Sequence, residues 1–385
     1  MGLEGFGTSA SAVWPQAGST PCGDVATPLR FSVVIPAYNA EDVLEQCLES
    51  VLSQGERSVE AIVVDDGSTD STAQLARRLA KDDDRITVLS QRNGGVSAAR
   101  NAGLDAATGK VVLFVDADDA LESGALESIW ARFVYGGLDC LVFGMRIEPE
   151  DAMPLTLSHR LAPGDAIIED DARRLIFAEH THPYAFRVAF SRDFLVQNSL
   201  RFDRGLTLGE DEAFLMTAYR LAHRAVLSSE RLYVYRMSAD SASHRDNASD
   251  EVLPAKLQKH LALVQSVLWE WQVRQLDDSC DQDLLDWLLD LLMLDVSRLE
   301  PEAQARFYAS LWPVLTSYFG SDGGQAVAHA TARRCLLAIR EAAAGRNGGG
   351  PVVPKPLLVA FYLHSRGAGA VVERAIASLR GRGAY

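Results

Sequence analysis

Three carboxylates follow directly on an apolar run in the segment VVLFVDADD, residues 111–119. They belong to Asp116, Asp118 and Asp119. Like charges this close repel and raise one another's pKa, so packing alone would not favour them. Carboxylate oxygens are the ligands that Mg²⁺ and Mn²⁺ prefer, whereas Leu121 stands where an EF-hand calcium loop needs glycine. The segment predicts a divalent metal that bridges a diphosphate, with a solvated turn as the alternative.

The same arrangement occurs four times in the first part of the sequence, where a polar segment follows each of four apolar runs. The runs are FSVVI (31–35), AIVV (61–64), ITVL (86–89) and VVLFV (111–115), and the segments after them are PAYN, DDGSTD, QRNGG and DADD. Helical patterns lie between the runs, and Ser68 or Thr69 is the expected N-cap of the second. Strands that alternate with helices predict a mostly parallel sheet covered on both faces. Ligands bind outside the carboxyl ends of such strands, so we expect these segments to meet and bind a nucleotide diphosphate.

A second carboxylate pair, Glu210 and Asp211, lies in the segment LGEDEAF. The pair could serve acid–base chemistry, or it could consist of ordinary first-turn helix acids stabilised by the macrodipole. The sequence has no Walker lysine and no GxGxxG or GxSxG motif. It therefore does not indicate a P-loop nucleotidase, a dinucleotide-dependent oxidoreductase or a serine hydrolase of the nucleophile-elbow type.

Composition excludes several further classes. The net charge of −15 disfavours a nucleic-acid partner, because phosphate attraction needs a basic face. Five scattered cysteines without a CxxC pair indicate reduced thiols rather than a disulfide framework. The first thirty residues lack the regions of a signal peptide, and no apolar run is long enough to span a bilayer. We therefore expect a cytoplasmic protein.

Four motifs in this order resemble glycosyltransferase family 2: SVVIPAYNAEDVLEQCLESVLSQ, VVDDGSTDST, NGGVSAARNAGLDAATGKVVLFVDADD and LGEDEAF. The resemblance covers residues 31 to about 245 and implies a GT-A fold with a Rossmann-like, mostly parallel sheet. It also implies an inverting enzyme that moves a sugar from a UDP-sugar to a hydroxyl of a glycolipid, polysaccharide or other cell-envelope glycan. The alternatives are a non-catalytic scaffold of the same fold and a sugar-nucleotide pyrophosphorylase.

The resemblance also implies which residues form the site. The nucleotide-sugar site would comprise Pro36, Tyr38, Asn39, Asp65, Asp66, Arg100, Asp116 and Arg236. Tyr38 would pack on the nucleobase, expected to be uracil, Asp66 would accept a hydrogen bond from it, and Arg236 would hold the diphosphate.

Metal and catalytic roles are implied in the same way. Asp118 and Asp116, with His244 as a third ligand, would hold Mn²⁺ or Mg²⁺, although His244 could equally be an exposed loop residue. Asp211 would be the general base, and Glu210 would position the acceptor or the donor.

The expected organisation has four parts. A disordered tail (1–29) precedes the catalytic domain (30–245), a helical region (246–344), and a linker with a basic amphipathic segment (345–385). The last segment could contact the inner face of the cell membrane, where a lipid-linked acceptor would lie, or pack against the helical region. A homo-oligomer is compatible with the sequence.

Overall fold

The computed structural model describes residues 29–55, 58–149, 162–179, 181, 184–237, 252–276, 278–346 and 349–379. The tail expected at residues 1–29 lies outside these ranges except for its last residue, and His244 lies outside them too. Contacts divide the chain into two compact units. The first contains the described residues up to Leu175 together with Glu179–Leu200 and Ala222–Arg236. The second contains Ile176–Ala178, Arg201–Leu221 and the described residues from Met237 onward.

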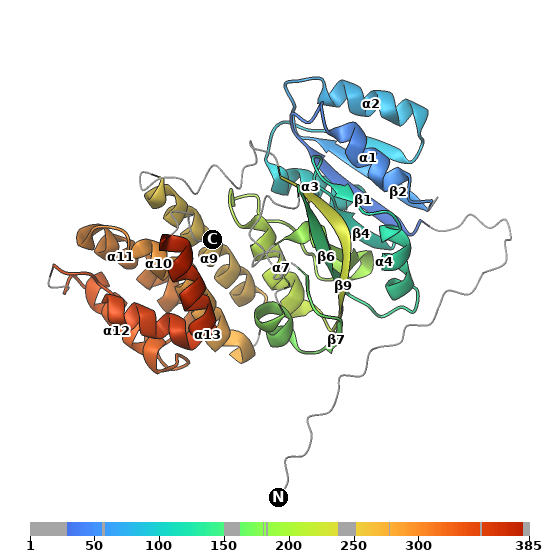
Figure 1. Cartoon of the computed structure of the whole chain (residues 1–385). Helices are drawn as coiled ribbons and strands as arrows, with labels where there is room; N and C mark the ends of the chain where they lie inside the picture. The colour runs from blue at the N-terminus through green and yellow to red at the C-terminus, as the bar shows by residue number, and fades with distance from the viewer. Residues whose placement is uncertain are drawn as a thin grey trace, which may run out of the picture. The chain divides into compact units, whose positions relative to one another are not determined.

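The first unit is built on one sheet with the strand order β3-β2-β1-β4-β8-β6-β9-β5, and β7 pairs with β9. Figure 1 labels β1, β2, β4, β6, β7 and β9 among these strands. The strands are β1 (Phe31–Ala37), β2 (Val59–Asp65), β3 (Ile86–Ser90), β4 (Val111–Phe114), β5 (Ala120–Leu121), β6 (Cys140–Glu148), β7 (Ala166–Glu169), β8 (Val188–Ser191) and β9 (Arg224–Arg236). β1 to β4 are mutually parallel, which confirms the sheet type that the sequence predicted. β8 is antiparallel to its neighbours β4 and β6.

Helices connect the parallel strands and pack against them. These are α1 (Leu44–Leu52), α2 (Thr72–Asp82) and α3 (Val96–Ala106), and the same unit also contains α4 (Ala125–Phe133) between β5 and β6 and α6 (Arg192–Gln197) after β8. Every residue of β4, and all but one of β1, is buried. Strands buried at consecutive positions are covered on both faces, as parallel sheets usually are. The apolar runs of the sequence therefore form the centre of this core.

A shift of register bends the long strand β9. β9 pairs in parallel with β6, and the register shifts on both sides of Gly144, where Phe143 pairs with Ser228 but Gly144 pairs with Arg231. Extra residues in one strand form a bulge, which bends the strand and changes the direction of its side chains. Beyond the bulge, Val234 pairs with Ala120 of β5. The carboxyl end of β9 is thereby placed beside the DADD segment.

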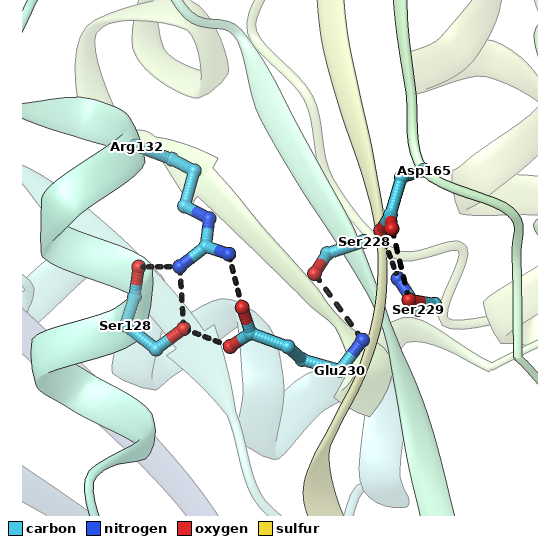
Figure 2. A network of polar contacts seen from close by, with 6 residues as sticks. All are labelled: Ser128, Arg132, Asp165, Ser228, Ser229 and Glu230. Atoms are coloured by element: carbon cyan, nitrogen blue, oxygen red, sulfur yellow. Dashed lines mark hydrogen bonds and ion pairs between the residues drawn. The ribbon is translucent and has the colours of Figure 1, made fainter. Parts of the chain in front are cut away.

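Figure 2 shows the polar network that surrounds this bulge. Arg132 Nη1 donates to the backbone oxygen of Ser128 (2.8 Å) and to its hydroxyl (2.6 Å), both on α4. The Arg132 guanidinium and the Ser128 hydroxyl also contact the carboxylate of Glu230 on β9. The adjacent Ser229 donates from its backbone N–H to Asp165 Oδ1 at 2.7 Å. Side chains of α4 and of Asp165, the residue before β7, therefore hold the bulge.

The second unit consists of helices. They are α7 (Glu210–Leu221), α9 (Leu253–Val273), α10 (Asp281–Val296), α11 (Pro301–Phe319), α12 (Ala330–Ala343) and α13 (Lys355–Leu379), the last five drawn in orange to red in Figure 1. Their core includes the fully buried side chains of Trp271, Tyr308 and Phe361. No helix among the described residues is long and apolar enough to cross a membrane.

The first part of α13 packs within this unit. Leu358, Phe361 and Tyr362 are buried, whereas Val359 and Leu363 are exposed. The hydroxyl of Tyr362 donates to the backbone oxygen of Asp290 on α10 at 3.0 Å. For this stretch the structure shows the packing that was one of the two expectations from the sequence. The side chains beyond Gly367, which carry most of the basic residues, lie outside the described part of the chain.

Candidate active site

Asn39 joins the polar segments that follow β1 and β2. Its Oδ1 accepts hydrogen bonds from the backbone N–H (2.8 Å) and the hydroxyl (3.2 Å) of Thr69. Its own N–H donates to Ser68 Oγ at 3.0 Å. Because α2 begins only at Thr72, the N-cap expected at Ser68 or Thr69 is wrong, and both residues bind Asn39 instead. Next to Asn39, the side chain of Tyr38 is 51% exposed and can receive a planar ligand.

Asp66 joins the segment after β2 to the segment after β3. Its Oδ1 accepts from Gln91 Nε2 (2.7 Å) and from the backbone N–H of Gly94 (2.8 Å). Its Oδ2 accepts from the N–H of Gly95 at 2.8 Å. A carboxylate oxygen has two lone pairs, so Oδ2 is the oxygen with capacity left for a ligand N–H. Asp66 is buried, with 4% exposure, so it fixes the QRNGG loop from within and keeps spare acceptor capacity on Oδ2.

The DDGSTD loop turns sharply at Gly67. Asp65 accepts the backbone N–H of Ser68 at 3.1 Å, which closes the turn. Gly67 has φ +73°, and a Cβ at this position would lie 2.8 Å from the backbone nitrogen of Asn93. Only glycine combines this backbone conformation with so close an approach. The segments after β2 and β3 thus contact each other through backbone, as the sequence predicted for one edge of the sheet.

Asp116, the first residue of DADD, is held by a buried arginine. Its Oδ1 lies 2.9 Å from Arg100 Nη2, and the Arg100 side chain is only 3% exposed. The N–H of Asp116 donates to the hydroxyl oxygen of Tyr233 on β9 at 3.2 Å. Arg100 therefore contacts the carboxylate cluster directly, and it orients one of the two carboxylates proposed to hold a metal.

Asp119, the last residue of DADD, is buried against β9. Its Oδ2 accepts from the Tyr233 hydroxyl at 2.7 Å, and its Oδ1 accepts from the backbone N–H of Arg236 at 2.8 Å. Burial and the charges of Asp116 and Asp118 raise the pKa of Asp119 to about 8. From the sequence, Asp119 was identified only as one of three carboxylates, and no role was predicted for Tyr233. Strand alternation in LYVYR could have suggested that Tyr233 points inward, but not what it meets.

Asp118 differs from Asp116 and Asp119 in its exposure and in its lack, within the described chain, of an ion pair or a hydrogen-bond partner on β9. It is exposed, and among the described residues none forms an ion pair with it. Desolvation by adjacent atoms and the charge of Asp116 nevertheless raise the pKa of its carboxyl. The charge of Arg236 acts in the opposite direction. Asp118 therefore presents an incompletely compensated carboxylate to a ligand.

This donor set fits a hard divalent cation. A cation at Asp118 and Asp116 would relieve the repulsion that raises the pKa of Asp118. The described residues contain no group of three or more His, Cys, Asp or Glu side chains arranged to hold a metal. Mg²⁺ is commonly held by one or two carboxylates, with substrate phosphates and water completing its shell, so two carboxylates suffice. The third ligand expected at His244 lies outside the described residues.

Two further predicted residues lie in the same unit. Pro36 is half-buried within β1, one residue before Ala37, at the carboxyl end of the strand. Arg236 ends β9, and its Nε lies 3.8 Å from Glu148 Oε2. The ring of Tyr233 stacks on Phe186, with centroids 4.6 Å apart and an interplanar angle of 18°. This stacking fixes the tyrosine whose hydroxyl binds both Asp116 and Asp119.

The predicted acid–base pair lies in the second unit. Glu210 and Asp211 are half-buried in the first turn of α7, where negative charge is favoured by the helix dipole. The next residue, Glu212, accepts a hydrogen bond from Trp287 Nε1 at 2.9 Å. The preceding Gly209 has φ +77°, and a Cβ there would lie 2.6 Å from Leu263 Cδ2 on α9. The pair therefore begins a helix that is packed closely within its own unit.

Comparison of the sequence with known proteins identifies a family and several similar proteins. Residues 32–227 match the family model described as glycosyl transferase family 2. The uncharacterized glycosyltransferase EpsJ of Bacillus subtilis is 31% identical over 242 residues, which are 60% of this chain and 68% of that protein. Poly(ribitol-phosphate) β-N-acetylglucosaminyltransferase TarS of Staphylococcus aureus is 30% identical over 210 residues, which are 54% of this chain but 35% of that protein.

Solved structures show the same fold. The crystal structure of residues 1–349 of S. aureus TarS in complex with UDP-GlcNAc superposes with a TM-score of 0.62 and 21% identity. It covers 82% of this chain and 89% of that one. The corresponding complex with UDP superposes with a TM-score of 0.60 and 22% identity, over 82% and 88% of the two chains. The fold similarity thus extends beyond the region that the family model matches.

Proposed function

The chain belongs to glycosyl transferase family 2, and on that premise we propose that it transfers a sugar from a UDP-sugar to an acceptor hydroxyl of a cell-envelope glycan. The observation that carries the proposal is the set of carboxylates at the ends of β2 and β4, with Asp66 offering an acceptor and Asp118 an exposed negative charge. A relative named as a poly(ribitol-phosphate) β-N-acetylglucosaminyltransferase and one named for succinoglycan biosynthesis support the glycan class, and a neighbour solved with UDP-GlcNAc supports the donor.

The donor-side roles follow from the contacts of each residue. The exposed ring of Tyr38 would stack on the uracil, and Asp66 Oδ2 would accept a hydrogen bond from the uracil N–H. Asn39 and Asp65 would act through the loop that they hold rather than on the ligand. Arg236 would bind the diphosphate. These residues orient the donor and leave its anomeric carbon open to attack.

The cation expected at Asp118 and Asp116 is Mn²⁺ or Mg²⁺, and it would neutralise the negative charge that develops on the departing UDP. Arg100 would keep the Asp116 carboxylate in position, because its guanidinium lies 2.9 Å away. The proton of the acceptor hydroxyl would pass to Asp211, while the hydroxyl oxygen attacks the anomeric carbon and the bond to UDP breaks. One displacement of this kind inverts the anomeric carbon and needs no covalent enzyme intermediate.

The proposal extends to contact with a membrane and to the oligomeric state. We infer that a lipid-linked acceptor would bring the protein to the inner face of the membrane, with the basic end of the chain as the contact. Val359 and Leu363 supply exposed apolar side chains on the described part of α13. A homo-oligomer is compatible with the fold.

Calorimetric titration with a panel of UDP-, GDP- and dTDP-sugars, in Mn²⁺ and in EDTA, tests the proposal. We expect at least one UDP-sugar to bind in Mn²⁺, with weaker binding in EDTA and no binding of the other nucleotides. Formation of UDP-sugar and pyrophosphate from UTP and a sugar 1-phosphate would instead identify a pyrophosphorylase. Absence of any nucleotide binding would indicate a scaffold and contradict the proposal.

A further inference from the structure

The segment that begins α7 is held by helices of the C-terminal half of the chain, all within the second unit. Asp203, in the loop before α7, accepts a hydrogen bond from the hydroxyl of Ser266 on α9 at 2.6 Å. Gly209, directly before α7, approaches Leu263 of α9 so closely that a Cβ would lie 2.6 Å from the leucine methyl. Two contacts from one helix therefore fix the chain as it enters α7.

A third contact comes from α10 and reaches the first turn of α7 itself. The indole Nε1–H of Trp287 donates to Glu212 Oε1 at 2.9 Å. Hydrogen bonds to an ionised group are shorter and stronger than neutral ones. Three residues further along α10, Asp290 pairs with Arg366 of α13, and the charge of Glu212 contributes to the raised pKa of Arg366. Glu212 thus lies in the field of a cation supplied by the last helix.

The Trp287 contact restrains the turn of α7 that also carries Asp211. Successive residues of an α-helix are separated by roughly 100° around the axis, so a restraint on Glu212 also limits how far the neighbouring Asp211 can turn with the backbone. Glu212 is anchored to α10, and Asp211 therefore projects from a different face of the same turn. Without the Trp287 contact, the first turn has one fewer restraint on its rotation and can fray, as helix ends do.

We propose that Trp287 is a positioning residue: through Glu212 it orients the first turn of α7 and hence the carboxylate of Asp211. The inference deepens the proposed function and rests on it, because it concerns the seat of the proposed base. The C-terminal helical region would then contribute to sugar transfer by holding the helix that carries Asp211, in addition to its role in packing.

The test compares two tryptophan-to-phenylalanine variants of the full-length protein. Trp287→Phe removes the indole N–H and keeps an aromatic ring, and Trp269→Phe makes the same change at an α9 side chain that is 61% exposed. UDP release is measured with water as the acceptor and the UDP-sugar that binds in Mn²⁺. We expect Trp287→Phe to lower kcat about tenfold with an unchanged donor Kd and only the small fall in Tm that the loss of one hydrogen bond causes, and Trp269→Phe to match the wild type.

Two further variants separate positioning from loss of charge. Glu212→Gln retains an oxygen that can accept from Trp287, so it should keep most of kcat. Glu212→Ala cannot accept, so it should resemble Trp287→Phe, and the double variant Trp287→Phe/Glu212→Ala should be no slower than either single one. Equal kcat for Trp287→Phe and Trp269→Phe, or a parallel fall of donor binding, Tm and kcat in Trp287→Phe, would overturn the proposal.

Hydrogen–deuterium exchange supplies a readout that does not depend on turnover. Peptides covering residues 206–215 should exchange faster in Trp287→Phe than in Trp269→Phe, because the first turn of α7 opens more often. The wild type could release no UDP from any donor while residues 206–215 still exchange faster in Trp287→Phe than in Trp269→Phe. In that case the proposed function is wrong, but Trp287 does hold the first turn of α7. Equal exchange in the two variants would contradict the seating itself.

Discussion

Asp119 and Asp118 are neighbours in the chain but differ in what surrounds them. Asp119 is 1% exposed, and its two carboxylate oxygens accept from Tyr233 and from the backbone of Arg236. Asp118 is exposed and free of ion pairs within the described chain. The residue that is buried thus attaches the segment to β9, and the residue that is exposed is available to a ligand. The sequence could indicate a carboxylate cluster, but burial by a distant strand decided which member does which.

The hydroxyl of Tyr233 is predicted to stabilise this arrangement. Tyr233→Phe removes the donor to Asp119 and the acceptor for the Asp116 N–H, while the ring can still stack on Phe186. We expect a loss of about 1–2 kcal/mol in the free energy of unfolding and weaker Mn²⁺ binding. Urea denaturation and Mn²⁺ titration measure the two effects. Tyr235→Phe, next-but-one on the same strand, is the control, and equal results for the two variants would contradict the assignment.

Substitution of Asp118 tests the cation site. Asp118→Asn removes the exposed negative charge without changing the size of the side chain, so a divalent cation should bind more weakly. We expect the Mn²⁺ dependence of UDP-sugar binding to disappear while the protein stays folded, because Asp118 makes no ion pair in the described structure. Calorimetry in Mn²⁺ and EDTA checks this. An unchanged difference between the two conditions would move the metal to other ligands.

Some strands of the sheet could be predicted from the sequence and others could not, depending on their local sequence pattern and on where in the chain the strands that pair with them lie. β1 to β4 are continuous apolar runs with a helical pattern between each run and the next, and their positions were predicted from the sequence. β8 and β9 were not, because their pairing with β4, β6 and β5 joins segments far apart and one of them contains a bulge. The site residues on early loops were therefore accessible to sequence reasoning, whereas the contributions of Tyr233 and Phe186 were not.

Helices α10 and α12 meet at a half-buried acid, Asp286, whose ionisation should affect stability. His329 caps α12 by accepting the N–H of Ala332, and its Nε2 lies 3.0 Å from Asp286 Oδ1. Burial, with the charges of Asp283 and Asp290, raises the pKa of Asp286 to about 7 from its ordinary value of 3.8. The folded state therefore retains a proton between these pH values that the unfolded state has lost.

It follows that this group makes the protein less stable as the pH rises from about 4 to about 7. Asp286→Asn should remove that part of the pH dependence and be relatively more stable than the wild type at pH 8 than at pH 5. Urea denaturation at the two pH values measures the difference. Glu302→Gln, an exposed acid on α11, is the control. An identical pH dependence in wild type and Asp286→Asn would show that Asp286 titrates normally.

At the scale of the whole molecule, the proposed chemistry is divided between two compact units. The nucleotide-binding segments and the aspartates of DADD belong to the first, and α7 belongs to the second together with the C-terminal helices. The sequence placed LGEDEAF with the upstream motifs because it follows them in order, and the catalytic domain of residues 30–245 stays a prediction. Contacts made by Leu263, Ser266 and Trp287 associate α7 with helices that the family resemblance did not cover.

The most direct test of the account compares donor binding and UDP release in Asp211→Asn. We expect this variant to bind the UDP-sugar in Mn²⁺ with the Kd of the wild type, because the base acts only on the acceptor. Release of UDP should fall by about a hundredfold or more, the usual contribution of a well-placed base. Release at the wild-type rate by Asp211→Asn would contradict the account, and a loss in Glu210→Gln alone would assign the base to Glu210.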